Sequence, residues 1–169
     1  TADSSLEGDA VSADISGLIG QYAHGNEPSH HIIHMYNYVN QPWKTQELID
    51  RVLKEQYRNA PDGLSGNEDC GQMSAWYILN AMGFYQVCPG KPVYSIGRPL
   101  FDKVTINLPE AKTFTIITKN NSKDNKYIES AMLNGQELNI PFLEHKDIAA
   151  GGTLEITSTN QPTKWGVQQ

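Results

Sequence analysis

The sequence predicts an α+β protein, because two different hydrophobic patterns occupy its two halves. In residues 12–88 the apolar side chains recur every three or four positions, which is the period of an amphipathic helix. Beyond Pro89-Gly90 the apolar residues alternate with a period of two, and polar turns separate the short runs. We therefore divide the chain into a helical part, residues 1–90, and a β part, residues 91–169, which is expected to form an antiparallel β-sandwich-like region.

Three helices are expected in the helical part. The first begins at Pro28, since proline is favoured in the first turn of a helix, and carries an apolar stripe that includes Ile32 and Val39. The second covers residues 43–57. The third covers residues 71–81 and ends before Gly83, and it is apolar on nearly all sides. Three helices cannot enclose such a helix, so the helical part is expected to pack on further helices outside this sequence.

Strands are expected wherever the two-residue alternation occurs in the β part. Asn134-Gly135 is a turn signal between two of them, as is Gly151-Gly152 before the last. The expected strands lie at residues 93–95, 104–106, 114–117, 127–133 and 154–156.

Charge and composition exclude two classes of partner. The chain has a formal net charge of −6 and a pI of about 5.3, and no run of Lys or Arg forms a basic face for nucleic acid. No apolar stretch reaches the ~18 residues that a membrane span needs. Cys70 and Cys88 are expected to stay unpaired, because the third helix separates them by more than a disulfide can bridge.

The segment from Gly66 to Tyr77 holds the most informative polar residues. Asn67, Glu68 and Asp69 stand together just before the third helix. A helix cap explains one of them, with Asp69 or Asn67 accepting the free N–H groups at the start of the helix, since an acidic group near a helix N-terminus is favourable. The alternative is a catalytic site. An inverting glycosidase needs one carboxylate as the base that activates water and a second carboxylic acid ~6.5–9.5 Å away, which must come from elsewhere because neighbouring side chains diverge.

A second polar segment lies upstream, at residues 25–31. Asn26 and Glu27 offer the hard oxygen ligands that Ca²⁺ prefers, although Glu27 also suits a helix N-terminus. His30 and His34 are four residues apart, a spacing that permits zinc, but they lack the His-Glu-x-x-His pattern. Polar lining of a substrate cavity is the alternative for His30.

Trp43 follows a turn and is a candidate platform for stacking on a sugar ring. The alternative is an ordinary place in the core, which is the default for an aromatic residue in a helical stripe.

Long motifs across the chain resemble glycoside hydrolase family 92. The resemblance covers roughly residues 12–166. The motifs that carry it are Gly25-Asn26-Glu27-Pro28-Ser29-His30-His31, Gln41-Pro42-Trp43-Lys44-Thr45, Pro61-Asp62-Gly63-Leu64, Gly66-Asn67-Glu68-Asp69-Cys70-Gly71-Gln72-Met73-Ser74-Ala75-Trp76-Tyr77, Gly83-Phe84-Tyr85, and Pro99-Leu100-Phe101.

The resemblance implies an exported, Ca²⁺-dependent exo-α-mannosidase that inverts the anomeric configuration and trims mannose from N-glycans or mannan. It implies an (α/α)₆ toroid, of which residues 1–90 would be the last helices, followed by a C-terminal β region. Asp69 resembles the general base, with Glu68 as a second acidic group, while Asn26 and Glu27 resemble calcium and mannose contacts. The general acid would lie in a preceding part of the same protein, so the isolated chain is expected to be inactive.

A non-catalytic carbohydrate-binding module is the alternative function. In that case the sandwich-like half would be autonomous, and the carboxylates would bind sugar hydroxyls without chemistry.

Overall fold

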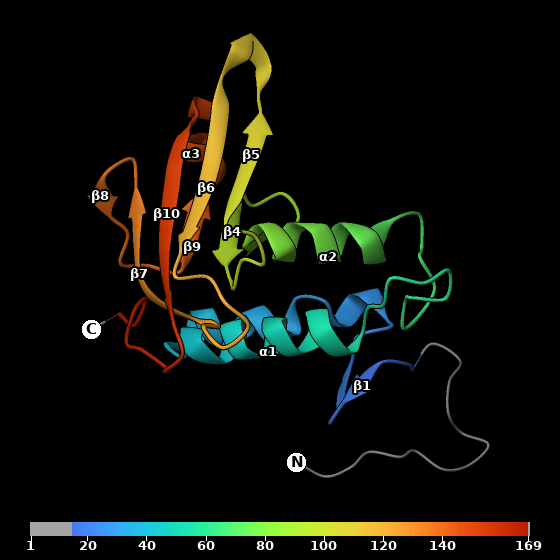
Figure 1. Ribbon diagram of the computed structural model, residues 1–169. Helices are drawn as coiled ribbons and strands as arrows, with labels where there is room; N and C mark the ends of the chain where they lie inside the picture. Colours follow the sequence, from blue (N-terminus) through green and yellow to red (C-terminus); the bar gives the residue numbers. More distant parts are fainter. Residues whose placement is uncertain (1–14, 169) are drawn as a thin grey trace, which may run out of the picture.

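Helices and sheets form two parts that lie against each other (Figure 1). The computed structural model describes residues 15–168. In chain order the elements are β1 (Leu18–Ile19), β2 (Tyr22–Ala23), η1 (Glu27–Ser29), η2 (Ile32–Val39), α1 (Pro42–Glu55), α2 (Gln72–Met82), β3 (Phe84–Tyr85), β4 (Val93–Ile96), β5 (Lys103–Asn107), η3 (Pro109–Ala111), β6 (Thr113–Lys119), β7 (Tyr127–Leu133), β8 (Gln136–Glu137), β9 (Phe142–Glu144), α3 (His145–Ala150) and β10 (Gly152–Thr159).

The prediction of one helix from Pro28 onward was wrong. The segment forms two 3₁₀ helices, η1 and η2, and a short hairpin of β1 and β2 precedes them. A 3₁₀ helix has three residues per turn, so positions three apart share a face. In η2 this arrangement buries both His34 and Asn37, whose side chains bond to β4. Tertiary hydrogen bonds therefore decide the winding of this segment.

The other two predicted helices, α1 and α2, begin and end within two residues of the predicted positions. The apolar stripe of α1 buries Ile49, Val52 and Leu53. The second of them, α2, is capped by Gly83. The backbone of Gly83 is left-handed, at φ 109°, and its N–H donates to the carbonyls of Leu79 and Asn80. Glycine is the usual residue for this conformation.

The β part contains two sheets. One has five strands in the order β5-β6-β10-β7-β8, and the other has three in the order β3-β4-β9. A single apolar core lies between them, with Phe84, Ile96 and Leu143 from the smaller sheet. The five-stranded sheet contributes Phe114, Ile116, Ile128, Ala131, Leu154 and Ile156.

The expected strands are present, and one pairing differs from the prediction. The last strand, β10, runs between β6 and β7 and is parallel to β6, with Leu154 opposite Ile116. The sheet is therefore mixed rather than purely antiparallel. Asn134-Gly135 makes the expected tight turn between β7 and β8, with φ of 51° and 79°. The short strands β3, β8 and β9 were not predicted, because segments of two or three residues carry too little period, and the six-residue helix α3 was not predicted either.

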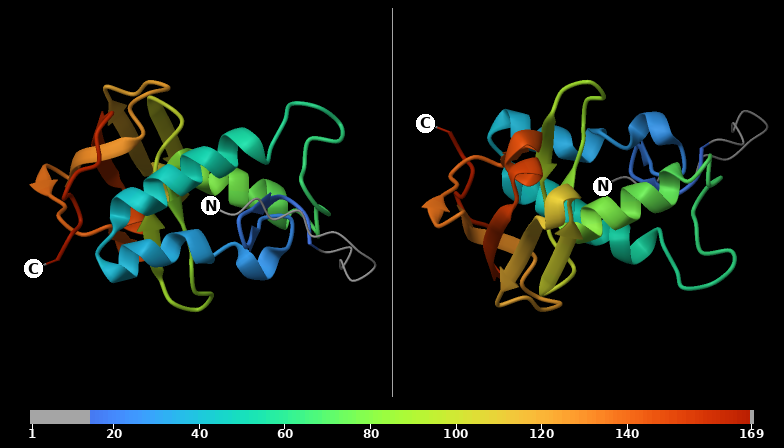
Figure 2. Two further views of the ribbon diagram at one scale, coloured as in Figure 1. Left: turned by 90° about the horizontal axis from the view of Figure 1, so that it is seen from below. Right: turned by 90° about the horizontal axis from the view of Figure 1, so that it is seen from above.

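Three buried polar links join the helical part to the sheets. Asn37 Nδ2 donates to the Ile96 carbonyl at 2.9 Å, and the Ile128 N–H donates to Gln46 Oε1 at 3.0 Å. The third link is an ion pair between Asp50 and Arg98, at 3.2 Å. Figure 2 shows α1 and α2 lying beside the sheets in both added views.

Among the residues described, no helix combines the length and the apolar character that crossing a bilayer requires.

An apolar stripe remains uncovered on η2. Ile32, Met35 and Tyr38 are three residues apart and are 43–45 % exposed, and the adjoining Val39 is 58 % exposed. The helix α2 likewise leaves Ile78 exposed, although its sequence is apolar on nearly all sides. Large apolar side chains that line up on one face mark a surface that contacts other protein.

We expect the 169-residue chain by itself to bind a hydrophobic fluorescent dye through this stripe. The double variant Met35→Gln, Val39→Gln should lower the dye signal, because it removes two exposed apolar side chains from one contiguous surface. The matched control is Met132→Gln, Ile140→Gln, which removes two exposed apolar side chains of the β part. A dye-silent, monomeric chain would contradict the prediction.

Candidate functional site

Two glycines bring the two polar segments together. A Cβ placed on Gly66 would lie 2.4 Å from the carbonyl oxygen of Gly25 and 2.8 Å from its Cα, so only glycine permits this approach. Gly25 precedes Asn26-Glu27, and Gly66 precedes the Asn67–Asp69 turn. Segments about forty residues apart in sequence therefore begin at one point of contact.

Glu27 has an unusual carboxylate. Its Oε1 atom is buried and has no hydrogen-bond partner within residues 15–168. Burying a carboxylate oxygen without a partner is unfavourable, so this atom suits a site that a cation completes. Asn26, beside it, also has no side-chain hydrogen bond in that part of the chain. The described residues hold no group of three or more His, Cys, Asp or Glu side chains that could bind a metal, so Asn26 and Glu27 would need further ligands.

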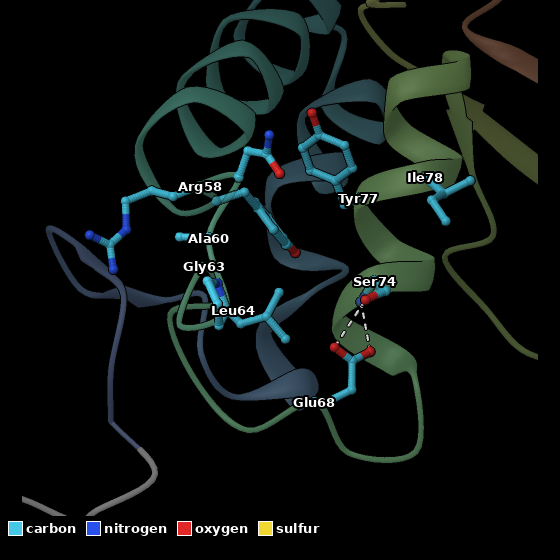
Figure 3. A pocket seen from close by; sticks show the side chains of 11 residues that line it. Arg58, Ala60, Gly63, Leu64, Glu68, Ser74, Tyr77 and Ile78 are labelled. Carbon is cyan, nitrogen blue, oxygen red and sulfur yellow. Dashed lines mark hydrogen bonds between the residues drawn. The ribbon is translucent and has the colours of Figure 1, made fainter.

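Glu68 and Asp69 are neighbours with different surroundings. The Glu68 carboxylate accepts hydrogen bonds from the Ser74 backbone N–H at 3.1 Å and from the Ser74 hydroxyl at 2.9 Å, as Figure 3 shows. It therefore satisfies an N–H in the first turn of α2, so the capping role falls to Glu68 and not, as predicted, to Asp69 or Asn67. Asp69 is exposed, and its carboxylate has no hydrogen bond or ion pair to the described residues.

The backbone of this turn is strained. Asp69, Cys70 and Gly71 have φ values of 47°, 58° and 92°, three left-handed residues in succession. Left-handed conformations are costly for residues with a Cβ, and such strain clusters at functional sites. The turn remains attached to α2, because the Gln72 N–H donates to the Asp69 carbonyl and the Met73 N–H donates to the Glu68 carbonyl, both at 3.3 Å.

A buried group of rings supports both segments, and its centre is His24. Tyr57 donates its hydroxyl hydrogen to the Met73 carbonyl, so it must accept from His24 Nε2, at 2.7 Å. His24 Nδ1 then carries no hydrogen and accepts from the Tyr22 hydroxyl at 2.8 Å. These partners define a neutral His24 with its hydrogen on Nε2. Burial, with a smaller contribution from nearby His30, lowers the pKa of His24 to about 3.

His30 is also committed to structural hydrogen bonds. Its Nε2 donates to the His24 carbonyl at 3.0 Å, and its Nδ1 accepts from Gln72 Nε2 at 3.3 Å. Burial lowers its pKa, although the bond to the His24 carbonyl opposes that effect. His34 instead contacts Ser95 of β4. The two histidines therefore have separate partners and do not form the zinc pair that their spacing allowed.

Trp43 is not brought to the same place as the other predicted site residues. It lies at the start of α1, whereas Tyr57, which contacts His24, follows the other end of that helix. A 14-residue helix is about 20 Å long. The sequence did not identify His24, Tyr22 and Tyr57 as supports of the site. A sequence pattern does not show which group a ring nitrogen or a hydroxyl will bond to in the folded chain.

A cavity of about 630 Å³ opens beside Glu68 (Figure 3). It lies between the loop after α1 and the exposed face of α2, with Arg58 and Leu64 on one wall and Ser74, Tyr77 and Ile78 on the other. Asn26, Glu27 and Asp69 do not line it. The cavity therefore includes Glu68 of the candidate site but not Asn26, Glu27 or Asp69.

An exposed carboxylate with free oxygens, such as that of Asp69, is what the base of an inverting glycosidase requires. Residues 3–160 match the profile of the glycosyl hydrolase family 92 catalytic domain, and the chain belongs to that family.

Known proteins with similar sequences and structures agree with this assignment. A family GH92 α-mannosidase from Bacteroides thetaiotaomicron, solved with mannoimidazole, is 40 % identical and superposes with a TM-score of 0.88 over 92 % of this chain and 20 % of its own. A family GH92 inverting mannosidase from the same organism is 48 % identical, with a TM-score of 0.83 over 88 % and 20 %. A protein of Arthroderma benhamiae named as an uncharacterized secreted glycosidase is 34 % identical over 148 residues, 86 % of this chain and 19 % of its own. The chain thus spans about a fifth of these relatives.

Acid should destabilise the fold through the buried histidines. Burial lowers the pKa of His34, like that of His24, from 6.5 to about 3. Between these values the unfolded chain binds more protons, so the free energy of unfolding should fall as the pH decreases from 6.5 toward 3. The loss is at most about 1.4 kcal/mol per pH unit for each histidine. Denaturant unfolding at several pH values measures it.

The control for this prediction is His31→Gln, since His31 is exposed and its replacement should change the pH dependence only slightly, because burial and not the charge of His31 is the largest cause of the lowered pKa of His34. The variant His34→Gln should make the dependence of the unfolding free energy on pH less steep, while His24 continues to contribute. A stability that stays constant from pH 7 to pH 4 would contradict the prediction.

Proposed function

We propose that this chain supplies the general-base side of a Ca²⁺-dependent, inverting exo-α-mannosidase that hydrolyses terminal α-linked mannose in glycans. Membership of family 92 and the mannosidase names of the similar structures support this reaction. The observation that carries the residue assignment is the contrast between Glu68, which is bonded to Ser74, and Asp69, whose carboxylate is exposed and unbonded.

Asp69 would accept the proton of the attacking water. A base must have a free oxygen within reach of that water, and Asp69 has two while both Glu68 oxygens are engaged. The Asp69 carbonyl is fixed to Gln72, so the turn presents the carboxylate from the start of α2. Inversion also needs a carboxylic acid on the leaving-group side, and we place it in a preceding part of the same protein.

Glu27 and Asn26 would hold the calcium ion. The buried, unpaired Glu27 oxygen and the unbonded Asn26 side chain are both hard oxygen donors. When bound, the calcium ion would accept hydroxyl oxygens of the sugar as ligands. In this proposal His30 does not contact the sugar. Both of its ring nitrogens are hydrogen-bonded within the protein, so it stabilises the segment that carries Asn26 and Glu27.

The remainder of the enzyme would complete an (α/α)₆ toroid around α1 and α2. The relatives are about five times as long as this chain, and apolar side chains of η2 and α2 are uncovered here. We also propose that the protein is exported, since the relative from Arthroderma benhamiae is named as secreted. The isolated 169 residues would then lack turnover, because they lack the acid.

In the full-length enzyme, Asp69→Asn should lower kcat by ~10²–10⁴ while KM changes little, because the loss falls on proton transfer in the transition state. Glu68→Gln is the matched control on the adjacent residue. It should affect stability or KM more than kcat, since Glu68 is bonded to Ser74. Steady-state kinetics decide between the two. An inactive Glu68→Gln beside an active Asp69→Asn would reverse the assignment, and two active variants would make the turn a simple cap.

Removing calcium should abolish turnover. Chelation followed by added Ca²⁺ should restore the rate, whereas Zn²⁺ should not, because the donors are hard oxygens and no thiolate is among them. The variant Glu27→Gln should raise the Ca²⁺ concentration for half-maximal rate. Glu137→Gln, an exposed glutamate in β8, is the control. Full turnover after thorough chelation would reject the proposal.

A further inference from the structure

We propose that His24 and Tyr57 are positioning residues that fix the placement of Glu27 relative to Asp69. This inference rests on the proposed function, in which Glu27 holds the ion and Asp69 activates water. The observation behind it is one continuous series of buried and partly buried hydrogen bonds that joins the two polar segments through the start of α2.

The first part of the series lies under the Asn26-Glu27 segment. His24 is completely buried, and its ring packs against His30, Trp76 and Tyr57 at centroid distances of 4.8, 4.4 and 5.3 Å. Its carbonyl accepts from His30 Nε2, and its chain neighbour Gly25 touches Gly66. The ring thus has no freedom to move independently of the backbone that leads into Glu27.

The second part joins this ring to α2. The Tyr57 hydroxyl bridges His24 Nε2, at 2.7 Å, and the Met73 carbonyl, at 3.0 Å. Two further bonds run parallel to it, from Gln72 Nε2 to His30 Nδ1 and from Trp76 Nε1 to the His30 carbonyl. All three therefore connect the first two turns of α2 to residues 24–30.

The third part joins α2 to the base. The N–H groups of Gln72 and Met73 donate to the carbonyls of Asp69 and Glu68. Residues 72 and 73 therefore carry bonds to the histidine group on one side and to the catalytic turn on the other. A displacement of α2 along its axis would move Asp69 but not Glu27, and the Tyr57 bridge, together with the two parallel bonds to His30, opposes that displacement.

Both hydrogen bonds of the bridge are made by the Tyr57 hydroxyl oxygen, so a substitution that removes this one atom tests the bridge. Tyr57→Phe removes the hydroxyl but keeps the ring that is stacked on Trp76, with an interplanar angle of 3°. Tyr94→Phe is a matched control, since it removes another tyrosine–histidine hydrogen bond, to His145 Nδ1 at 3.0 Å, which joins β4 to α3. Gln72→Met, with a side chain of similar length, removes the parallel bond to His30.

In the full-length enzyme, Tyr57→Phe should lower kcat about 10- to 100-fold, because misplacing catalytic groups by about 1 Å can cost ~10² in rate. The assay is run well below each variant's unfolding temperature, which removes the effect of stability. Gln72→Met should give a smaller loss of the same kind. Tyr94→Phe should keep the wild-type kcat. In crystal structures of the variants, Asp69 should be displaced relative to Glu27 in Tyr57→Phe. The displacement should be smaller in Gln72→Met and absent in Tyr94→Phe.

A Tyr57→Phe enzyme that unfolds at a lower temperature but keeps the wild-type kcat would overturn the inference, since that is the result for a purely structural hydrogen bond. An unchanged separation of Asp69 and Glu27 would overturn it as well. If Tyr57→Phe does not fold, Gln72→Met decides by the same two readouts. A wild-type enzyme without mannosidase activity would instead refute the proposed function, while the crystallographic comparison would still decide the positioning role.

Discussion

The packing around Trp76 is the constraint on which the site depends. The indole is completely buried, and the rings of His24, His30, His34, Tyr57 and Tyr85 all surround it, with centroids 4.4–6.5 Å away. It sits one turn into α2, and its Nε1 donates to the His30 carbonyl. Burial lowers the pKa of all three histidines and so favours their neutral forms, and the hydrogen bonds of His24 and His30 assign a donor and an acceptor nitrogen to each of these two rings. The 24–34 segment can therefore bind α2 in one arrangement, which is what a precisely placed site requires.

Buried polar groups, more than apolar contact, determine how the helices sit on the sheets. Asn37, Gln46 and the Asp50–Arg98 pair each reach from a helical segment to the β part. Arg98 also donates to the Ser122 carbonyl, and Asp50 also accepts from Lys54. Removing one partner of such a pair leaves a buried charge, which costs more than the pair itself contributes. These links make the β part a support for the helices and argue against an autonomous sugar-binding module.

Two adjacent carboxylates in this protein have different physical situations. Glu68 is drawn into the first turn of α2, where two donors of Ser74 satisfy it. Asp69, one residue later, is held in a left-handed conformation, and its exposed carboxylate has no hydrogen bond or ion pair to the described residues. Asp69, Cys70 and Gly71 are left-handed in succession, whereas Glu68 is not. One carboxylate thus stabilises the helix that presents the other, so the cap and the candidate base are both needed.

Local patterns in the sequence determined the helices α1 and α2, the strands β4, β5, β6, β7 and β10, and the turn at Asn134-Gly135, because these elements are long enough to repeat their period. The motifs around Glu27 and Asp69 likewise identified the family. Only the tertiary structure decided that η2 winds as a 3₁₀ helix, that β10 enters the sheet parallel to β6, and that Trp43 lies away from the polar segments. It also decided that His30 serves the protein's own hydrogen bonds and that Glu68 caps α2. Each of these depends on which partner meets a side chain across tens of residues, and a sequence period carries no information about that partner.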